Sequence, residues 1–368
     1  MRVLFAGGGT AGHINPAISV ADYIKTKVPD FEALFIGTQR GLETKLVPKA
    51  GYNIEYIDIE GFSRRNMLKN VSVAKKLITS VARCKKIIKE FKPDCVVCTG
   101  GYVSGPVAMA AKAMKVPSMI HEQNVYPGLT VKGAQKYVNY LALSFEETKN
   151  FMSAKEKCVV TGNPIRTEIL SANKNTARAK LGIEKPFVLV FGGSLGAGAI
   201  NEAVLGMLST ICEEGKFSLL FGTGDRNYES IMQRVKESGI ELTEDVKIVS
   251  YIDNMAECMA AADVVVSRAG AITVSEIAAL AKPSVLIPSP NVVRNHQEQN
   301  AREFVKNDAA DMITEDKLTP EVLYQRILGM VSNEDLLNRM SHNLRALAKT
   351  DALERIYDLV VKMSTEKK

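Results

Sequence analysis

Short apolar runs alternate with amphipathic helical periods along most of the chain. The first unit, residues 2–24 (RVLFAGGGTAGHINPAISVADYI), indicates a buried strand, a glycine turn and a helix with one apolar face. The same order returns at residues 187–208 (FVLVFGGSLGAGAINEAVLGML). Alternation of strands with helical segments is typical of parallel α/β folds.

A second pair of segments repeats in the same way. Residues 93–122 and residues 262–290 each indicate a strand, a glycine turn, a helix, a proline and a further strand. At 368 residues the chain exceeds what one hydrophobic core usually supports, so two Rossmann-like domains in tandem explain the repeats. The polar, turn-rich stretch 161–182 predicts the boundary, and apolar residues at helical spacing in 353–363 predict a closing helix.

Polar residues follow several of the predicted strands. In parallel sheets ligands bind outside the carboxyl ends of the strands, and if the two edges face each other such residues line one inter-domain cleft. In the first half these residues are His13, Tyr102, Ser104 and the run His121–Asn124, and in the second half Ser194, Ser275, Glu276 and Gln297.

Composition predicts a cytoplasmic protein without a metal. No apolar run reaches the roughly 18 residues that span a bilayer, and the chain opens directly into a strand rather than a secretory signal. The CVVC sequence at 95–98 lies in an apolar run and indicates buried strand cysteines rather than a redox pair. Four scattered histidines have no metal-ligand spacing, which argues against a structural zinc site. We expect no metal, and the function favoured below needs no cofactor.

The net charge of +6 is concentrated in one segment. Residues 64–92 hold ten Lys or Arg and a single acid, Glu90, over a helical apolar stripe. The segment is either an ordinary amphipathic helix or a surface for anionic lipid headgroups. Nucleic acid is not expected as a partner, because few aromatic residues lie among these charges.

The first glycine loop matches G-x-G-x-x-G at residues 7–12, which raises an NAD(P)-dependent oxidoreductase as an alternative. An acid that binds the ribose should then lie at the end of the second strand, but the only acid of that strand, Glu32, lies at its start. Arg40, which follows the strand, could instead bind the 2′-phosphate of NADP, so an NADP-dependent enzyme remains an alternative. His13 presents an imidazole beside these glycines, either for chemistry or as a capping or packing residue.

The second glycine loop is better suited to phosphate. Glycines at 192–198 let the backbone approach, Ser194 adds a hydroxyl, and the following helix presents its positive end. There is no P-loop motif and no D-x-D triplet. The carboxylate of Glu276, beside Thr273 and Ser275, can accept hydrogen bonds from both hydroxyls of a ribose. Alternatively, Glu276 is an acid that caps a helix.

Together these motifs resemble the MurG family, which transfers N-acetylglucosamine (GlcNAc) from UDP-GlcNAc to the undecaprenyl-linked MurNAc-pentapeptide. Seven motifs in the family's order carry the resemblance: GGTAGH (8–13), GGYVSGP (100–106), HEQN (121–124), GNPIR (162–166), GGSLGA (192–197), GAITVSE (270–276) and NHQEQNA (295–301).

The resemblance implies a GT-B fold, two Rossmann-like domains whose parallel sheets face each other across a cleft. An acceptor and membrane-facing domain is expected at 1–163, a UDP-GlcNAc domain at 164–345, and a closing helix at 346–368 that packs back on the first domain. The implied donor-sugar contacts are Thr10, Ala11, Gly12, Asn124 and Gln297. The implied uridine diphosphate site is Arg166, Ser194, Ile252, Ala271, Ile272, Thr273, Val274, Ser275 and Glu276. His296 is left unassigned.

Two positions depart from the family pattern. Ala11 replaces a usual glycine, and Gly198 stands where a basic or bulkier residue is common. The resemblance implies inversion at the anomeric carbon, with His13 as general base, Glu122 in reserve, and Tyr102 and Ser104 on the acceptor side. It also favours the lipid-facing interpretation of 64–92 and a peripheral place on the cytoplasmic membrane face. A sugar-nucleotide epimerase of the same architecture is the further alternative.

Overall fold

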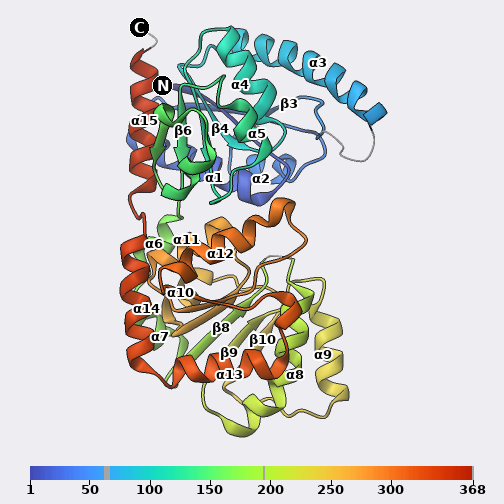
Figure 1. Cartoon of the computed structure of the whole chain (residues 1–368), viewed down its shortest axis with the longest axis vertical. Coiled ribbons are helices and arrows are strands. Elements are labelled where there is room, and N and C mark those ends of the chain that lie inside the picture. Colours follow the sequence, from blue (N-terminus) through green and yellow to red (C-terminus); the bar gives the residue numbers. More distant parts are fainter. Residues whose placement is uncertain (62–66, 194, 367–368) are drawn as a thin grey trace. The chain divides into compact units, whose positions relative to one another are not determined.

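The computed structural model describes residues 1–61, 67–193 and 195–366. The chain divides into two compact units (Figure 1). The first unit contains Met1–Ile165 together with Lys349–Lys368, and the second contains Arg166–Ala348.

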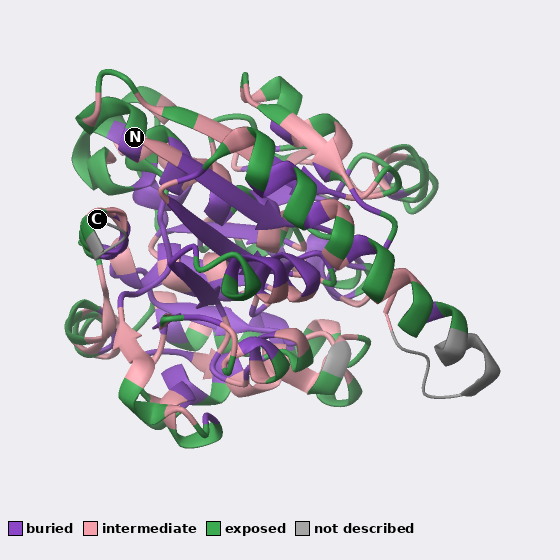
Figure 2. Cartoon of the chain, turned by 90° about the horizontal axis from the view of Figure 1, so that it is seen from above, coloured by how far each residue is buried: buried purple, intermediate pink, exposed green. Residues whose placement is uncertain are grey.

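The first unit is built on a seven-stranded parallel sheet of order β3-β2-β1-β4-β5-β6-β7. Its central strands are buried on both faces, as parallel strands covered by helices must be (Figure 2). The strands are β1 (Arg2–Gly7), β2 (Glu32–Gly37), β3 (Asn53–Tyr56), β4 (Cys95–Gly100), β5 (Ser118–Glu122), β6 (Tyr140–Leu143) and β7 (Cys158–Val160).

Helices cover both faces of this sheet. Leu4 and Ala6 pack in one apolar core with the helices of residues 67–134, whereas Val3 and Phe5 pack in the other with α1 and α15. The period of two along β1 therefore assigns its side chains to the two layers. The helices are α1 (Ala11–Lys27), α2 (Glu43–Lys49), α3 (Met67–Phe91), α4 (Ser104–Ala113), α5 (Leu129–Ala134), η1 (Glu146–Phe151), η2 (Lys155–Lys157) and α15 (Ala352–Glu366).

The closing helix α15 belongs to the first unit. Ile356, Val360 and Met363 are fully buried in the core that α1 lines. They lie at the helical spacing seen in the sequence, and burying each side chain contributes roughly 2 kcal/mol.

The second unit repeats the plan with a six-stranded parallel sheet of order β10-β9-β8-β11-β12-β13. The strands are β8 (Phe187–Phe191), β9 (Ser218–Gly222), β10 (Val246–Val249), β11 (Val264–Ser267), β12 (Ser284–Leu286) and β13 (Asp311–Met312). The helices are α6 (Thr167–Ser171), α7 (Lys174–Leu181), α8 (Gly198–Glu214), α9 (Tyr228–Glu237), α10 (Met255–Ala261), α11 (Ala271–Ala279), η3 (Val293–Asn295), α12 (His296–Lys306), η4 (Glu315–Lys317), α13 (Pro320–Val331) and α14 (Glu334–Leu347).

The strand orders confirm the prediction of two Rossmann-like halves. In each unit the chain reverses its direction of winding beside the first strand, between β1 and β4 and between β8 and β11. Ligands bind at such switch points in doubly wound sheets. Both glycine loops start from these strands, so the fold brings the sequence motifs to these two edges.

Two further expectations can be compared with the fold. Cys95 and Cys98 are buried, and burial raises the pKa of Cys98 to about 12, so the Cys98 thiol stays protonated and unreactive. Among the helices of the described residues, none is long and apolar enough to cross a membrane.

Candidate functional site

In the first unit His13 lies in the opening turn of α1, directly after the glycine loop. Its Nδ1 is 3.1 Å from the Gly8 carbonyl oxygen and 3.2 Å from Thr10 Oγ1. A carbonyl only accepts hydrogen bonds, so Nδ1 donates its proton to Gly8 and the lone pair of the neutral ring is on Nε2. The ring packs against β4, where a Cβ on Gly100 would lie 2.6 Å from His13 Cδ2.

A buried carboxylate, which sequence reasoning did not identify, lies beneath the same loop. Glu43 Oε2 accepts from the Gly9 amide at 3.0 Å, and Oε1 accepts from the Thr38 amide at 2.9 Å and from Thr38 Oγ1 at 2.8 Å. Burial alone would raise the pKa of Glu43, but these hydrogen bonds outweigh it and the pKa is lowered. Glu43 is therefore an anion at neutral pH.

This carboxylate argues against the dinucleotide alternative. A dinucleotide pyrophosphate needs the loop amides as donors, but the Gly9 amide already donates to Glu43. A phosphate at the loop would also lie beside a buried negative charge, which repels it. The G-x-G-x-x-G match is therefore not a nucleotide cradle in this chain.

The loop after β4 separates the two residues expected on the acceptor side. Tyr102 is 60% exposed, with its ring over the backbone of Gly61, where a Cβ would lie 2.2 Å from the ring. The expectation for Ser104 is wrong, because its side chain is fully buried. Its hydroxyl accepts from the Gly100 amide at 3.0 Å and lies 2.8 Å from the Gly100 carbonyl oxygen, so it holds the turn instead of facing an acceptor.

The HEQN motif also turns mainly inward. Glu122 is 2% exposed, and its carboxylate accepts from the Gly128 amide at 2.8 Å and from the backbone and side-chain nitrogens of Asn124 at 3.0 and 3.1 Å. Burial raises the pKa of Glu122, and these bonds offset only part of the rise. Glu122 thus braces the 124–128 loop, a geometry that favours His13 over it as the base. Asn124 lies half-buried on that loop.

In the second unit the glycine loop forms a tight turn between β8 and α8. A Cβ on Gly192 would lie 2.4 Å from the Ala197 nitrogen, and one on Gly196 would lie 1.9 Å from the Thr223 carbonyl oxygen. Helix α8 then presents its first-turn amides and positive dipole end beside the turn. Ser194, the predicted phosphate contact, lies outside the described residues.

Two predicted donor-site residues meet in this unit. Glu276 on α11 is 6% exposed, and its Oε1 accepts from Arg166 Nε and Nη2, both at 3.1 Å. Burial raises the pKa of Glu276, and the Arg166 guanidinium counteracts the rise. Arg166 remains half-exposed, so the pair has one buried and one accessible partner.

The other residues of the 271–276 run lie on buried and half-buried faces of α11, as the helical period places them. Ala271 and Val274 are buried, and Ile272 and Thr273 are half-buried at the start of α11. The Ser275 hydroxyl donates to the Ala271 carbonyl at 2.9 Å, within the helix. Apart from Glu276, the groups of this run best placed to contact a ligand are therefore Thr273 and the backbone of the first helical turn.

The last two predicted residues lie at neighbouring loops of the same unit. Ile252 follows β10 and is 6% exposed, with its side chain against Gly222, so only its backbone is suited to a polar contact. Gln297 is in the first turn of α12, where its Oε1 accepts from the Ser289 amide at 2.9 Å. Arg294 and Asn295, just before it, both have left-handed backbones, with φ of 55° and 53°.

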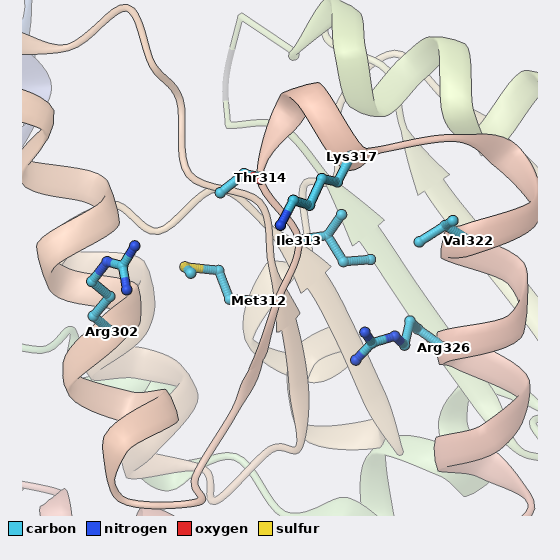
Figure 3. Close-up of a pocket in the computed structure, with 7 residues that line it drawn as sticks. All are labelled: Arg302, Met312, Ile313, Thr314, Lys317, Val322 and Arg326. Carbon is cyan, nitrogen blue, oxygen red and sulfur yellow. The ribbon is translucent and has the colours of Figure 1, made fainter.

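A cavity of about 470 Å³ lies elsewhere in the second unit, beside the edge strand β13 (Figure 3). It contains none of the predicted site residues, and two of its cations already have acidic partners, Arg302 with Glu298 and Arg326 with Asp311. We therefore do not assign the reaction to it. Its lining is Arg302, Met312, Ile313, Thr314, Lys317, Val322 and Arg326. In the described part of the chain no cluster of His, Cys, Asp and Glu is arranged to hold a metal ion.

Comparison with known proteins gives concordant results. The glycosyltransferase family 28 N-terminal domain matches residues 3–142, and the family 28 C-terminal domain matches residues 187–356. A protein of Acetivibrio thermocellus is 46% identical over 362 residues, covering 98% of this chain and 97% of its own. It is named UDP-N-acetylglucosamine--N-acetylmuramyl-(pentapeptide) pyrophosphoryl-undecaprenol N-acetylglucosamine transferase. A protein of Clostridioides difficile with the same name is 42% identical, covering 100% of this chain and 90% of its own.

Solved structures agree with the fold. The crystal structure of MurG from Acinetobacter baumannii superposes with a TM-score of 0.80 at 29% identity, covering 98% of this chain and 99% of that one. A UDP-GlcNAc 2-epimerase from Neisseria meningitidis reaches a TM-score of 0.67 at 14% identity, with 98% and 100% coverage. At that identity the epimerase shares the fold, and nothing about its reaction is transferred.

Proposed function

The chain belongs to the MurG group of glycosyltransferase family 28, and on that premise we propose that it transfers GlcNAc from UDP-GlcNAc to the C4 hydroxyl of the lipid-linked MurNAc-pentapeptide. The product is lipid II, the completed peptidoglycan precursor. Identity of 46% over nearly the whole chain carries this proposal. Its support from the structure is that each glycine loop lies at the switch point of its own sheet.

We assign uridine diphosphate to the second unit. The Glu276 carboxylate can accept hydrogen bonds from both ribose hydroxyls, and Arg166 favours its ionised form. The backbone of Ile252 is the proposed uracil contact, and the first turn of α8 with Ser194 the proposed diphosphate contact. Thr10, Ala11, Gly12, Asn124 and Gln297 remain the proposed contacts of the donor sugar.

The reaction is a single displacement with inversion. The C4 oxygen of the acceptor forms its bond to the anomeric carbon while the bond from that carbon to the UDP oxygen breaks. His13 Nε2 takes the hydroxyl proton, for which the tautomer with its proton on Nδ1 is suited. The electron pair leaves with UDP, whose growing charge the helix-end amides stabilise.

The deciding experiment is transfer of labelled GlcNAc from UDP-GlcNAc to a lipid I analogue, with EDTA present. We expect labelled lipid II and a rise in melting temperature with UDP but not with NAD(P). Epimerised UDP-GlcNAc formed without acceptor, or stabilisation by NAD(P) alone, would contradict the proposal.

The role of His13 has its own test. His13→Ala should lower turnover by roughly 10² or more while stabilisation by UDP persists. The matched control is His342→Ala, which removes an exposed histidine from α14 in the other unit. Unchanged turnover in His13→Ala would remove it from the mechanism.

We further propose that α3 meets anionic lipid and holds the enzyme at the cytoplasmic membrane face. Lys75, Ile78, Lys85 and Lys89 are exposed and spaced to follow one face of the helix. Ile78 is 72% exposed, an apolar side chain set among cations. Figure 2 shows the long exposed flank of this helix. Such a face is suited to an anionic bilayer surface.

Not every basic residue of the segment is available for lipid. Lys76 pairs with Asp58 at 3.0 Å and Glu60 at 2.6 Å, and Arg83 pairs with Glu55 at 2.6 Å. The sequence count therefore overstated the unpaired charge. Arg64 and Arg65, which are part of that count, lie outside the described residues.

Vesicle sedimentation tests this surface. Replacing Lys75, Lys85 and Lys89 by Glu should abolish binding to vesicles that contain anionic lipid, and added salt should weaken binding by the wild type. The control carries the same charge change on exposed lysines of the second unit, Lys216, Lys236 and Lys247. Equal binding by both triple variants, or binding indifferent to salt and anionic lipid, would defeat the proposal.

A further inference from the structure

One peptide group connects the buried carboxylate to the imidazole. The N–H of the Gly8–Gly9 peptide donates to Glu43 Oε2 at 3.0 Å, and the C=O of the same peptide accepts from His13 Nδ1 at 3.1 Å. The peptide is trans and planar, so these two groups point in opposite directions. Glu43 and His13 are thus held on opposite edges of a single amide.

The surrounding glycines provide the space that the Glu43 carboxylate and the Gly8–Gly9 peptide occupy. A Cβ on Gly8 would lie 2.7 Å from Glu43 Oε1, and a Cβ on Gly41 would lie 1.9 Å from Oε2. A Cβ on Gly101 would lie 2.3 Å from the Gly8 oxygen itself. Any side chain at these positions would displace the carboxylate or rotate the peptide, so the glycines serve the internal contacts rather than a phosphate.

The charge of Glu43 has a chemical consequence at the far edge of the peptide. A carboxylate that accepts from the N–H of an amide polarises it and makes its carbonyl a stronger acceptor. Full burial of Glu43 keeps water from screening this effect. The strengthened carbonyl holds the proton on Nδ1, keeps the lone pair on Nε2, and favours the imidazolium once the ring has taken a proton.

We propose that Glu43 is a positioning residue for His13, acting through the Gly8–Gly9 peptide. The arrangement parallels a Ser-His-Asp triad, in which a buried carboxylate orients the histidine, but here an amide stands between the two groups. The inference rests on the proposed role of His13 as general base.

The test compares Glu43→Gln with Glu32→Gln, which neutralises an exposed acid at the start of β2. The Gly9 and Thr38 donors approach different oxygens of the carboxylate, and glutamine replaces one of these oxygens by an NH2 group that cannot accept. The substitution therefore removes one of the two contacts, and the peptide loses its charged partner. We expect kcat to fall about tenfold to a hundredfold in Glu43→Gln, with KM for UDP-GlcNAc within about twofold of the wild type. Glu32→Gln should match the wild type. An unchanged kcat in folded Glu43→Gln overturns the proposal.

Nitrogen-15 NMR of the histidine rings distinguishes a Glu43 that sets the His13 tautomer from one that only supports the glycine loop. The chain has four histidines, and His13→Ala assigns the signal of interest. We expect wild-type His13 to carry its proton on Nδ1 and Glu43→Gln to show a lower fraction of this tautomer. Loss of kcat with an unchanged tautomer would mean that Glu43 only braces the loop, and would overturn the proposal.

Two further measurements keep the outcomes distinct. The wild-type tautomer is measured without a Glu43 variant, so a proton found on Nε2 of His13 refutes the inference even if Glu43→Gln does not fold. Thr38→Val removes a bond on the β2 side and leaves the Gly9 bond, so it should lower the melting temperature and keep the His13 tautomer. Full turnover by His13→Ala would refute the general-base role, whereas the tautomer measurements would still test the Glu43 contact.

Discussion

Acid should destabilise the first unit through His121, the first residue of the HEQN motif. Its ring is 1% exposed; Nε2 lies 2.9 Å from the Gly162 carbonyl oxygen, and Nδ1 lies 3.0 Å from Gln123 Nε2. Burial lowers the pKa of His121 to about 4, although the Gly162 bond raises it in part. The ring is thus neutral, with Nε2 donating to Gly162 and Nδ1 accepting from Gln123.

The sign and size follow from linkage. The unfolded chain protonates this histidine near pH 6.5 and the folded chain near pH 4, so the unfolded state binds more protons between these values. Stability from His121 is therefore complete above about pH 6.5 and is lost as the pH falls toward about 4. The whole gap corresponds to about 3 kcal/mol, of which about 2 kcal/mol is lost between pH 7 and pH 5.

The assay is a difference between variants, because Glu122 beside it has a raised pKa and contributes with the opposite sign. The free energy of opening is measured by hydrogen exchange of β5 amides at pH 7 and pH 5, which reports on the first unit alone. The wild type should lose about 2 kcal/mol more than His121→Gln over this interval. His342→Gln controls for loss of a histidine. An equal loss in the wild type and His121→Gln would refute the account of the buried ring.

Two other predictions concern the donor site and backbone strain. Glu276→Gln should weaken UDP binding roughly tenfold to a hundredfold in calorimetry, because the proposed charged acceptor for the ribose hydroxyls is lost, whereas Glu237→Gln on α9 should leave UDP binding unchanged. Lys115 lies two residues beyond the end of α4 with φ of 57°, so Lys115→Gly should raise the free energy of unfolding by about 1 kcal/mol. Lys112→Gly, inside α4, should lower it by about the same amount, and the same sign for both in urea unfolding would contradict the strain argument.

The fold was predictable from the sequence because two periodicities carry it. Alternation in β1 and the helical stripe of α15 are local patterns, and each assigns side chains to a layer without knowledge of the partner. The repeated strand, glycine turn and helix then indicate parallel βαβ units, whose crossovers have one hand. The two-domain repeat could therefore be predicted from the sequence without knowledge of any tertiary contact.

The site was predictable only where backbone position decides it. Residues after the strands do reach the sheet edges, but whether a side chain points out or in depends on tertiary neighbours. Ser104 and Glu122 lie at the expected edges and turn inward, because the turns that follow β4 and β5 need internal acceptors. Glu43 was missed because an acid in the first turn of a helix is favoured by the helix dipole alone. The signal available was Gly8, Gly37 and Gly41, all of which make room for it.

The two glycine loops illustrate why a repeated sequence pattern need not repeat a function. Both follow a central strand and precede a 17-residue helix. In the first, a carboxylate of the protein accepts from the Gly9 amide and fills the place of an anion, so the loop can orient an imidazole instead of binding phosphate. In the second, the N-cap residue of α8 is Ala197, which has no side-chain acceptor to compete for the first-turn amides. The buried negative charge of Glu43 thus opposes binding of a diphosphate at the first loop, and the second loop, whose first-turn amides have no such acceptor from the N-cap residue, remains the proposed diphosphate site.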